Sequence, residues 1–479
     1  MKRLQSAEER SVDLLKYAHR IDFTTGSIPR HLLVFIVPLL LGNLLQTFYS
    51  TVDSIWVGRF LGPGALAAVA VSFPVLFIVV SFVIGLAIAT NIMIAQYQGA
   101  HQEEEARKTV GNSLMIMVVL GIGLTFLGLA FHQDLLRLIN TPEEIFPAAS
   151  SYLLIIFTGL VPLFVFNGVS SVMRGFGDSR TPLLLLGWST VINVVLDPLM
   201  ILGIGPFPRM EVAGAALATV IAQGFSGVYG LYLLHRQRTI HFHKDALRFQ
   251  PDIVRLIFRL GLPAGIQQVG VSIGVLVLMA LVNSFGKTVV AAFGAAQRID
   301  QLSFLPAFSF GLAVSPLAGQ NLGAHLFERS REVLRWSSLL GAGFSLIVSL
   351  VVFLLADRLI RIFIFDPAVV VIGVDYLRIV AFSYVPFSLL FVFSGFIRGA
   401  GDAVASTVLT LLAFVFIRLP LAYLLASQSS LRAQGIWIAM AISPVIGLLI
   451  SIIYYQRGNW KTKILTDPKK AFGQPFPQE

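Results

Sequence analysis

The sequence predicts an all-α polytopic membrane protein, with twelve transmembrane helices in two pseudo-symmetric six-helix bundles. Of its 479 residues, 56% are hydrophobic and only 13% are charged, whereas soluble domains have about 25% charged residues. Apolar runs longer than the roughly 18 residues needed to cross a bilayer recur along the chain, without the alternation typical of a membrane β-barrel. An internal repeat divides these runs into two sets of six.

Each predicted helix corresponds to one apolar run bounded by polar, glycine-rich or proline-rich residues. In chain order, the twelve predicted spans are centred on 33–57, 65–95, 110–131, 146–172, 182–204, 212–234, 257–283, 289–320, 333–356, 371–396, 404–427 and 433–455.

The distribution of the 35 lysines and arginines predicts the orientation of the chain. Most of them lie on the side that carries the N-terminus, and an even number of spans places the C-terminus there too. Basic segments stay in the cytoplasm, so we expect both termini to be cytoplasmic in a plasma membrane or a bacterial inner membrane. The predicted organisation is a cytoplasmic segment 1–30, a six-helix lobe 31–235, a cytoplasmic loop 236–255, a six-helix lobe 256–456 and a basic tail 457–479.

The repeat appears as a short motif in both halves. SSVMRGFGDSRTP at 170–182 matches FSGFIRGAGDAVAST at 393–407. The two copies are 224 residues apart, and the same spacing relates Tyr152 to Tyr376. A duplication of six spans inserts both copies in one orientation, and transporters built from such repeats bind substrate where the repeats meet.

Two carboxylates lie inside predicted spans of the first half. Asp53 is in the outer part of the first span, and Asp197 is at a similar depth in the fifth, with Asn193 one helical turn before it. Ionisable groups at this depth are costly and indicate function. Together the three side chains can bind a proton or ligate Na+. The alternatives are that Asp53 is solvated near the interface and that Asp197 is a buried structural carboxylate.

Prolines inside spans are candidate hinges, because each removes a backbone hydrogen bond. Pro38 shares its helix with Asp53, and Pro198 follows Asp197 and frees the carbonyl of Val194. We predict hinges at Pro38 and Pro198; the alternative for each is a permanent kink without motion.

Other polar and aromatic residues within or near the spans are candidates for a substrate cavity. Arg298, Asp300 and Arg418 can attract or repel a charged substrate, or pair with helix carbonyls and with each other. Phe304 near Met279 suits flat apolar compounds, although core or lipid-facing packing also explains aromatic residues. The predicted cavity residues are Gln46, Met279, Asn283, Arg298, Asp300, Phe304 and Arg418.

These motifs resemble the multidrug and toxic compound extrusion (MATE) family over residues 30 to 457. The segments that carry the resemblance are PLLLGNLLQTFYSTVDSIWVGRFLGPGALAAVAVSFP at 38–74, MRGFGDSRTPLLL at 173–185, INVVLDPLMILG at 192–203, GAALATVIAQ at 214–223, SPLAGQNLGA at 315–324 and IRGAGD at 397–402.

The resemblance implies export of amphipathic or cationic organic compounds in exchange for H+ or Na+. It also implies that the coupling ion binds in the first lobe, at Asp53, Asn193, Asp197 and Thr219. The norfloxacin-exporter branch carries further acidic residues in its seventh and tenth helices. This chain lacks them, so the resemblance is to the DinF-like branch.

Other functional classes fit the sequence less well. A flippase for lipid-linked saccharides, from the same superfamily, is the alternative, although its cavity needs more cationic groups than Arg298 and Arg418 supply. A channel or scaffold does not need two buried carboxylates in one repeat. The sequence contains no cysteine, no metalloprotease motif and no phosphate-binding loop, so we expect that the protein is not an enzyme. We expect a monomer that contacts lipid and a small organic substrate, without cofactor or nucleic acid.

Overall fold

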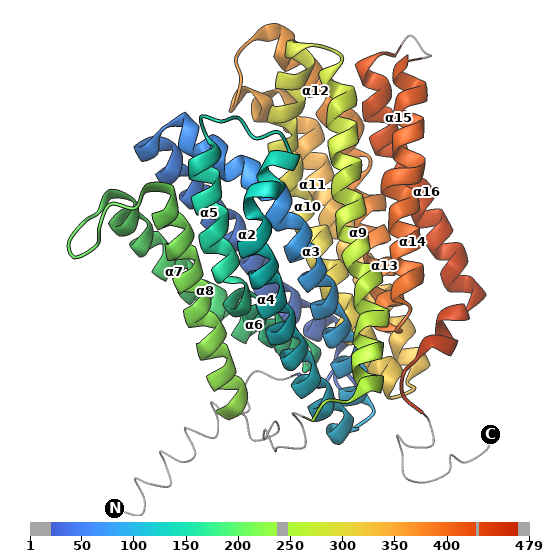
Figure 1. The fold of residues 1–479 in the computed structure, drawn as a ribbon. Helices are drawn as coiled ribbons and strands as arrows, with labels where there is room; N and C mark the ends of the chain where they lie inside the picture. Colours follow the sequence, from blue (N-terminus) through green and yellow to red (C-terminus); the bar gives the residue numbers. More distant parts are fainter. Residues whose placement is uncertain (1–20, 237–247, 428–430, 468–479) are drawn as a thin grey trace, which may run out of the picture. The chain divides into compact units, whose positions relative to one another are not determined.

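The computed structural model describes residues 21–236, 248–427 and 431–467, and all regular secondary structure in these ranges is helical (Figure 1). The first half contains α2 (Ile28–Leu61), α3 (Pro63–Gly99), α4 (Glu103–Leu138), α5 (Phe146–Thr158), α6 (Leu160–Gly175), α7 (Arg180–Leu202) and α8 (Glu211–Arg236). The second half contains α9 (Pro251–Asn283), α10 (Lys287–Gly323), α11 (Phe327–Arg361), α12 (Pro367–Ala381), α13 (Tyr384–Gly399), α14 (Ala403–Leu411), the π-helix η2 (Leu412–Ile417), α15 (Arg418–Ser427), α16 (Ala433–Arg457) and the 3-10 helix η3 (Asn459–Lys463).

The predicted number of spans is confirmed within these ranges. Ten helices, with α14, η2 and α15 taken as one, are long and apolar enough to cross a membrane, and two bent helix pairs supply the other two spans. Each of the twelve coincides with one predicted apolar run. Parts of the predicted cytoplasmic segments, at 1–20, 237–247 and 468–479, lie outside the described residues.

Both bent spans break just before a proline. α5 and α6 meet at 51°, and α12 and α13 meet at 45°. Pro162 and Pro386 are the third residues of α6 and α13. Because proline has no N–H to bond the carbonyl four residues earlier, the helix loses a hydrogen bond at each break. The two prolines have the same spacing as the two copies of the repeated motif, so the bend is part of the repeat.

The repeated Gly-Asp motif connects consecutive helices in each half. Gly177 and Gly401 have φ of 83° and 93°, a conformation that favours glycine. Asp178 then accepts hydrogen bonds from the backbone N–H groups of Arg180 and Thr181. In the second half, Asp402 accepts one from the backbone N–H of Ala405. The motif is therefore a turn-and-cap device that starts α7 and α14.

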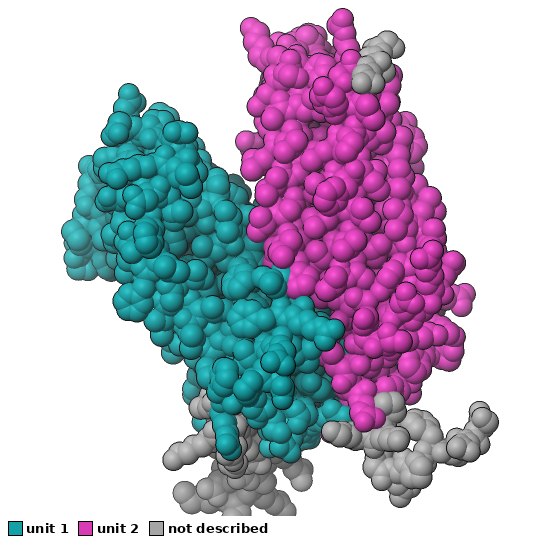
Figure 2. All heavy atoms as spheres, turned by 45° about the vertical axis from the view of Figure 1, so that its right-hand side comes forward, with its two compact units in different colours: residues 1–22, 37–98, 102–262 teal, residues 23–36, 99–101, 263–479 magenta. Residues whose placement is uncertain are grey.

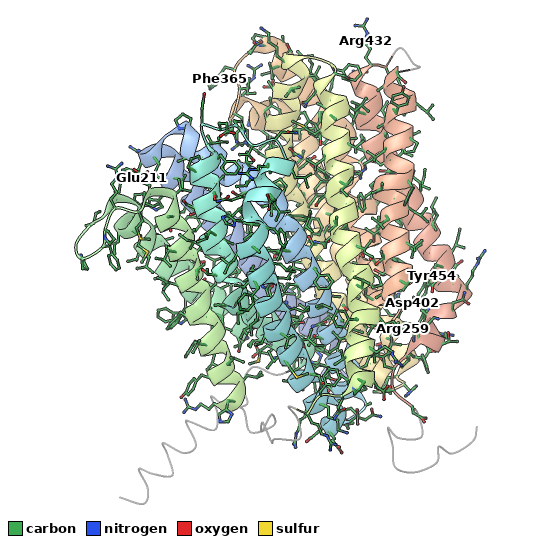
Figure 3. All side chains as sticks on the ribbon, viewed as in Figure 1. Glu211, Arg259, Phe365, Asp402, Arg432 and Tyr454 are labelled. Carbon is green, nitrogen blue, oxygen red and sulfur yellow. The ribbon has the colours of Figure 1, made fainter. Side chains whose placement is uncertain are left out.

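Side chains also tie the motif to a neighbouring helix in the second half. The hydroxyl of Tyr454 on α16 donates to Asp402. Figure 3 shows both residues at the end of this half opposite to Phe365 and Arg432. Asp402 therefore caps one helix and anchors another.

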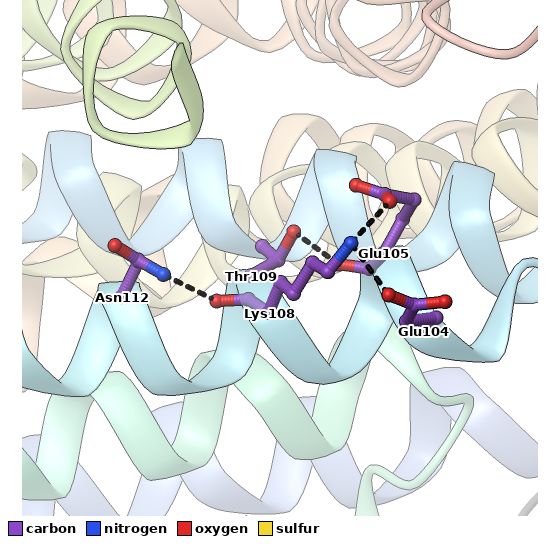
Figure 4. Close-up of polar contacts among 5 residues, drawn as sticks. All are labelled: Glu104, Glu105, Lys108, Thr109 and Asn112. Atoms are coloured by element: carbon purple, nitrogen blue, oxygen red, sulfur yellow. Dashed lines mark hydrogen bonds and ion pairs between the residues drawn. The ribbon is translucent and has the colours of Figure 1, made fainter. Parts of the chain in front are cut away.

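Charge pairing marks the first turns of α4 (Figure 4). Lys108 lies 2.7 Å from Glu104 and 3.0 Å from Glu105, and the amide of Asn112 donates to the carbonyl of Lys108. The glutamates also lie at the helix N-terminus, where negative charge is favoured by the helix dipole.

The helices group into two compact units, coloured separately in Figure 2. Unit 1 comprises Met1–Asp22, Val37–Gln98 and Gln102–Leu262, and unit 2 comprises Phe23–Ile36, Gly99–His101 and Pro263–Glu479. In unit 1, α8 packs against α5, α6 and α7; in unit 2, α13 packs against α10, α11 and α16.

The chain passes between the units near the first helix of each half, and Gly99–His101, at the end of α3, is a further short segment of unit 2. The predicted first lobe begins at residue 31, yet Phe23–Ile36 belong to unit 2; the predicted second lobe begins at 256, yet the chain stays in unit 1 to Leu262. Pro38 lies two residues after the first changeover, and Pro263 opens the second.

Hydrogen bonds to its backbone explain why the segment Phe23–Ile36 belongs to unit 2. The N–H of Phe23 donates to Gln320, while Asn321 and Arg329 donate to the carbonyl of Phe23. Arg329 also donates to the carbonyls of Thr25 and Gly26. The start of α2 is therefore held by unit 2.

The segment before α9 docks in a similar manner within unit 1. Asn112 of α4 donates to the carbonyl of Arg248 and accepts from the N–H of Gln250. Sequence reasoning does not reveal either docking, because both depend on contacts between residues far apart in the chain.

Candidate functional site

The four residues predicted to bind an ion lie on three helices of unit 1. Asp53 is on α2, Asn193 and Asp197 are on α7, and Thr219 is on α8. Asn193 and Asp197 are fully buried, whereas Asp53 and Thr219 are partly buried. The fold therefore gathers these side chains inside one unit.

Hydrogen bonds link the three helices. The amide of Asn193 donates to Asp197 at 3.0 Å and to Thr219 at 3.4 Å. The hydroxyl of Tyr49, one turn before Asp53 on α2, donates to Thr219 at 3.1 Å. Thr219 therefore accepts from both α2 and α7.

The two carboxylates have no basic partner. Asp53 and Asp197 are close enough to repel each other electrostatically. No salt bridge joins either of them to a lysine, arginine or histidine in the described part of the chain. The cluster therefore carries up to two negative charges that other side chains do not balance.

Three oxygen atoms of this cluster are buried without a donor: Oδ1 of Asp53, Oδ1 of Asn193 and Oδ2 of Asp197. Leaving a buried acceptor unpaired costs about 1–3 kcal/mol, and more for a charged group. A proton shared by the carboxylates, or a small hard cation held by these oxygens, removes that cost. The donor set is all oxygen, which fits H+ or Na+.

Sequence reasoning missed two tyrosines of the site. Tyr49 precedes Asp53 by four residues and so shares its helix face, which was the available signal. Tyr152 of α5 appeared only as part of the repeat, but it lies close enough to both carboxylates to interact with them electrostatically. No sequence spacing links Tyr152 to α2 or α7.

Both predicted hinge prolines lie inside continuous helices. Pro38 is buried in α2, and Pro198 lies in α7 next to Asp197. The helices pass through both residues without a break, and hinge motion at either remains a prediction.

Five of the seven predicted cavity residues fall into two groups. Gln46, Asn283 and Arg298 are exposed. Met279 and Phe304 pack against the buried cluster of unit 2. Gln46 belongs to unit 1 and the other six predicted cavity residues belong to unit 2.

Asp300 and Arg418 are already bonded within unit 2. Both oxygens of Asp300 accept hydroxyl hydrogen bonds at 2.5 Å, from Tyr376 and Tyr384. The guanidinium of Arg418 donates to Ser443 at 2.9 Å. Both residues therefore have side-chain partners inside unit 2, and a role of either in the substrate cavity remains a prediction.

Comparison with known proteins identifies relatives of the whole chain. The sequence model of the MatE family matches residues 38–199 and 263–424, one range in each half. The "Probable multidrug resistance protein YpnP" of Bacillus subtilis is 35% identical over 447 residues, which cover 93% of this chain and 99% of that protein. The "Probable multidrug resistance protein YoeA" of the same organism is 33% identical, covering 92% and 96%.

Solved structures show the same fold. A crystal structure of "MATE in the bent conformation" superposes with a TM-score of 0.86 at 24% identity, covering 93% of this chain and 98% of that one. The predicted fold class is therefore confirmed.

Proposed function

Because the chain belongs to the MATE family of multidrug efflux transporters, and is thus a transporter and not an enzyme, we propose that it is a secondary antiporter. It exports amphipathic or cationic organic compounds in exchange for H+ or Na+, which binds at Asp53, Asn193, Asp197 and Thr219. The observation that carries this proposal is the set of three unpaired buried oxygens, two of them on carboxylates that no basic side chain of the described residues balances. The names of the relatives do not favour a flippase for lipid-linked saccharides.

The ion gradient sets how far such an antiporter can concentrate its substrate. A tenfold inward gradient of one monovalent ion supplies about 1.4 kcal/mol. Moving one net charge across 100 mV adds about 2.3 kcal/mol. In a one-for-one exchange, a neutral substrate is concentrated roughly 500-fold, and a monovalent cation about tenfold because no net charge moves.

The first helix is the element that we expect to respond to the ion. Asp53 and Pro38 lie on α2, and this helix begins in unit 2 and continues in unit 1 from Val37. An ion at Asp53 ends its repulsion with Asp197, and a helix that lacks the Pro38 hydrogen bond can bend in response. Pro198 gives α7 the same freedom beside Asp197.

Substrate binding must supply part of the conformational free energy. Reversing a 1:99 preference between two conformations requires about 5.5 kcal/mol of differential binding. We assign substrate contacts to Gln46, Met279, Asn283, Arg298 and Phe304.

The same proposal includes the membrane topology. We place the chain in a cell membrane as a monomer of the DinF-like branch, with both termini in the cytoplasm, because basic residues gather on that side. The chain has no cysteine, so single cysteines report sidedness. Arg236→Cys should be labelled only from the cytoplasm and Pro208→Cys only from outside; labelling of both from one side would contradict twelve spans.

Transport in proteoliposomes tests the function. Substrate efflux is measured with a pH gradient alone and with a Na+ gradient alone, for the parent, Asp53→Asn and Asp197→Asn. Asp357→Asn, which changes an exposed carboxylate paired with Arg361, is the matched control. We expect gradient-driven efflux to fall at least tenfold in both site variants and to stay within twofold in the control. Parent-like efflux in both site variants would refute the assignment of the coupling site.

A further inference from the structure

The repeat relates two polar residues of unit 2, Tyr376 and Ser443, to residues at the ion site of unit 1. Ser443 corresponds to Thr219, and Tyr376 corresponds to Tyr152, because each pair is 224 residues apart, like the two copies of the repeated motif. In unit 1, Thr219 accepts from Asn193; in unit 2, Ser443 accepts from Arg418. Arg418 therefore makes the bond that Asn193 makes in the other repeat.

A local change in helix geometry explains the shift of one residue in this correspondence. The plain offset would pair Asn193 with Ile417, but η2 (Leu412–Ile417) is a π-helix that ends immediately before Arg418. A π-turn adds one residue to the helical turn. The residue that faces Ser443 is then Arg418, one position later.

The two clusters differ in how their charge is balanced. In unit 1, three buried acceptor oxygens have no donor. In unit 2, both oxygens of Asp300 accept from tyrosines, Tyr376 of α12 and Tyr384 of α13. Arg418 of α15 makes no direct ion pair with Asp300 in the described residues; its positive charge acts on Asp300 and Tyr376 through space, and its guanidinium lies 4.5 Å from the centre of the Phe414 ring. The charge of Asp300 is thus offset by a side chain of the protein.

We propose that Arg418 is a tethered cation that takes, in unit 2, the place the coupling ion takes in unit 1. This inference rests on the ion site proposed above and adds that unit 2 binds no coupling ion. An arginine keeps its charge and cannot dissociate. The cluster of unit 2 is therefore neutralised throughout the transport cycle, and a single ion site, that of unit 1, drives export.

A structural consequence follows for the bent span of unit 2. Asp300 of α10 bonds one tyrosine on each side of the break between α12 and α13. With Arg418 in place, this connection holds whether or not an ion is present. Unit 2 then keeps its internal arrangement while the ion acts on unit 1.

The test measures thermal unfolding of the full-length purified protein with and without Na+ and between pH 5 and pH 8. All variants carry Asp53→Asn and Asp197→Asn, which silence the response of unit 1. In this background, Arg418→Gln leaves Asp300 without a counter-charge. Arg298→Gln, an exposed arginine two residues from Asp300, is the matched control.

We expect Arg418→Gln to lower the unfolding temperature by about 5 °C or more and to make it dependent on added Na+ or on acid. Arg298→Gln should melt within about 1–2 °C of the background and show no such dependence. Adding Asp300→Asn to Arg418→Gln should abolish the dependence, because no charge then needs balancing.

Two results would overturn the inference. One is an Arg418→Gln protein that melts like the control or ignores both Na+ and pH. If Arg418→Gln does not fold, the second result comes from Arg418→Lys, which keeps the positive charge. We expect the unfolding temperature of Arg418→Lys to be independent of Na+ and pH. A dependence on either would refute a tethered cation. Failure of the proposed function gives a different result. In that case, Na+ and pH change the unfolding temperature of the parent no more than that of the protein carrying Asp53→Asn and Asp197→Asn.

Discussion

Thr219→Val changes the ion site without changing the size of the side chain. The hydroxyl of Thr219 accepts hydrogen bonds from Tyr49 on α2 and Asn193 on α7. The substitution leaves the Tyr49 hydroxyl without this acceptor, whereas Asn193 keeps its bond to Asp197. An unpaired buried donor costs about 1–3 kcal/mol. In addition, the site loses one oxygen that can contact the ion.

The lost contact to the ion is the part that changes ion affinity, because the unpaired Tyr49 hydroxyl costs stability with and without the ion. A contact worth about 1–3 kcal/mol weakens ion binding roughly 5- to 150-fold when it is lost. The assay is substrate efflux from proteoliposomes as a function of the driving ion, H+ or Na+, which gives the ion concentration for half-maximal drive. We expect Thr219→Val to raise this concentration at least fivefold, while substrate binding without a gradient changes less than twofold.

Thr125→Val is the control for a lost threonine hydroxyl. Thr125 of α4 donates to the carbonyl of Phe157 at 2.8 Å, outside the ion site of the same unit. Its substitution should lower thermal stability but leave the half-maximal ion concentration unchanged. If Thr219→Val and Thr125→Val had the same ion dependence, Thr219 would not belong to the ion site.

Two further predictions concern the connection between sequence and fold. Gly99→Ala should reduce the yield of folded protein at least severalfold, because a Cβ there would lie 1.8 Å from the carbonyl oxygen of Gln320. The control is Gly123→Ala, which has no atom within 4 Å of its Cβ and should give the yield of the parent, measured by size-exclusion chromatography. Equal yields of the two variants would contradict the close approach at Gly99. Arg329→Gln should raise the rate of thiol labelling of Thr24→Cys at least tenfold, because the guanidinium no longer holds the carbonyls before α2; an unchanged rate would show that this docking is not maintained by Arg329.

The membrane spans were predictable because hydropathy and turn residues act locally. Each apolar run became one span, and a glycine such as Gly203, which has φ of 74°, ends α7 in the left-handed conformation that glycine favours. The breaks at Pro162 and Pro386 were less visible. An apolar run looks the same whether its helix is straight or bent, and most prolines within these spans, such as Pro38, leave the helix continuous.

The ion site was partly predictable for a different reason. Asp53 and Asp197 stand out because charge is rare at this depth, and Asn193 lies one turn from Asp197. The spacing of Tyr49 offered a further signal. The bond from Tyr49 to Thr219 joins α2 to α8, and residues 170 positions apart leave no trace of such a contact in a single sequence.

Asp300 and Arg418 illustrate what a single sequence conceals. Both are charged residues in apolar spans, so the sequence supports a cavity role and internal pairing equally. Only the packing of α10 against α12 and α13 shows that Tyr376 and Tyr384 bond Asp300.

The most direct measurement is the release of the coupling ion when substrate is added to purified protein, followed as protons in weakly buffered solution or as displaced radioactive Na+. In an antiporter, ion and substrate exclude each other, so the account predicts release of about one ion per chain from the parent. It predicts release from Asp357→Asn as well, and none from Asp53→Asn or Asp197→Asn. If substrate bound to the parent without releasing either ion, or if the two site variants released as much as the parent, coupling through these carboxylates would be contradicted.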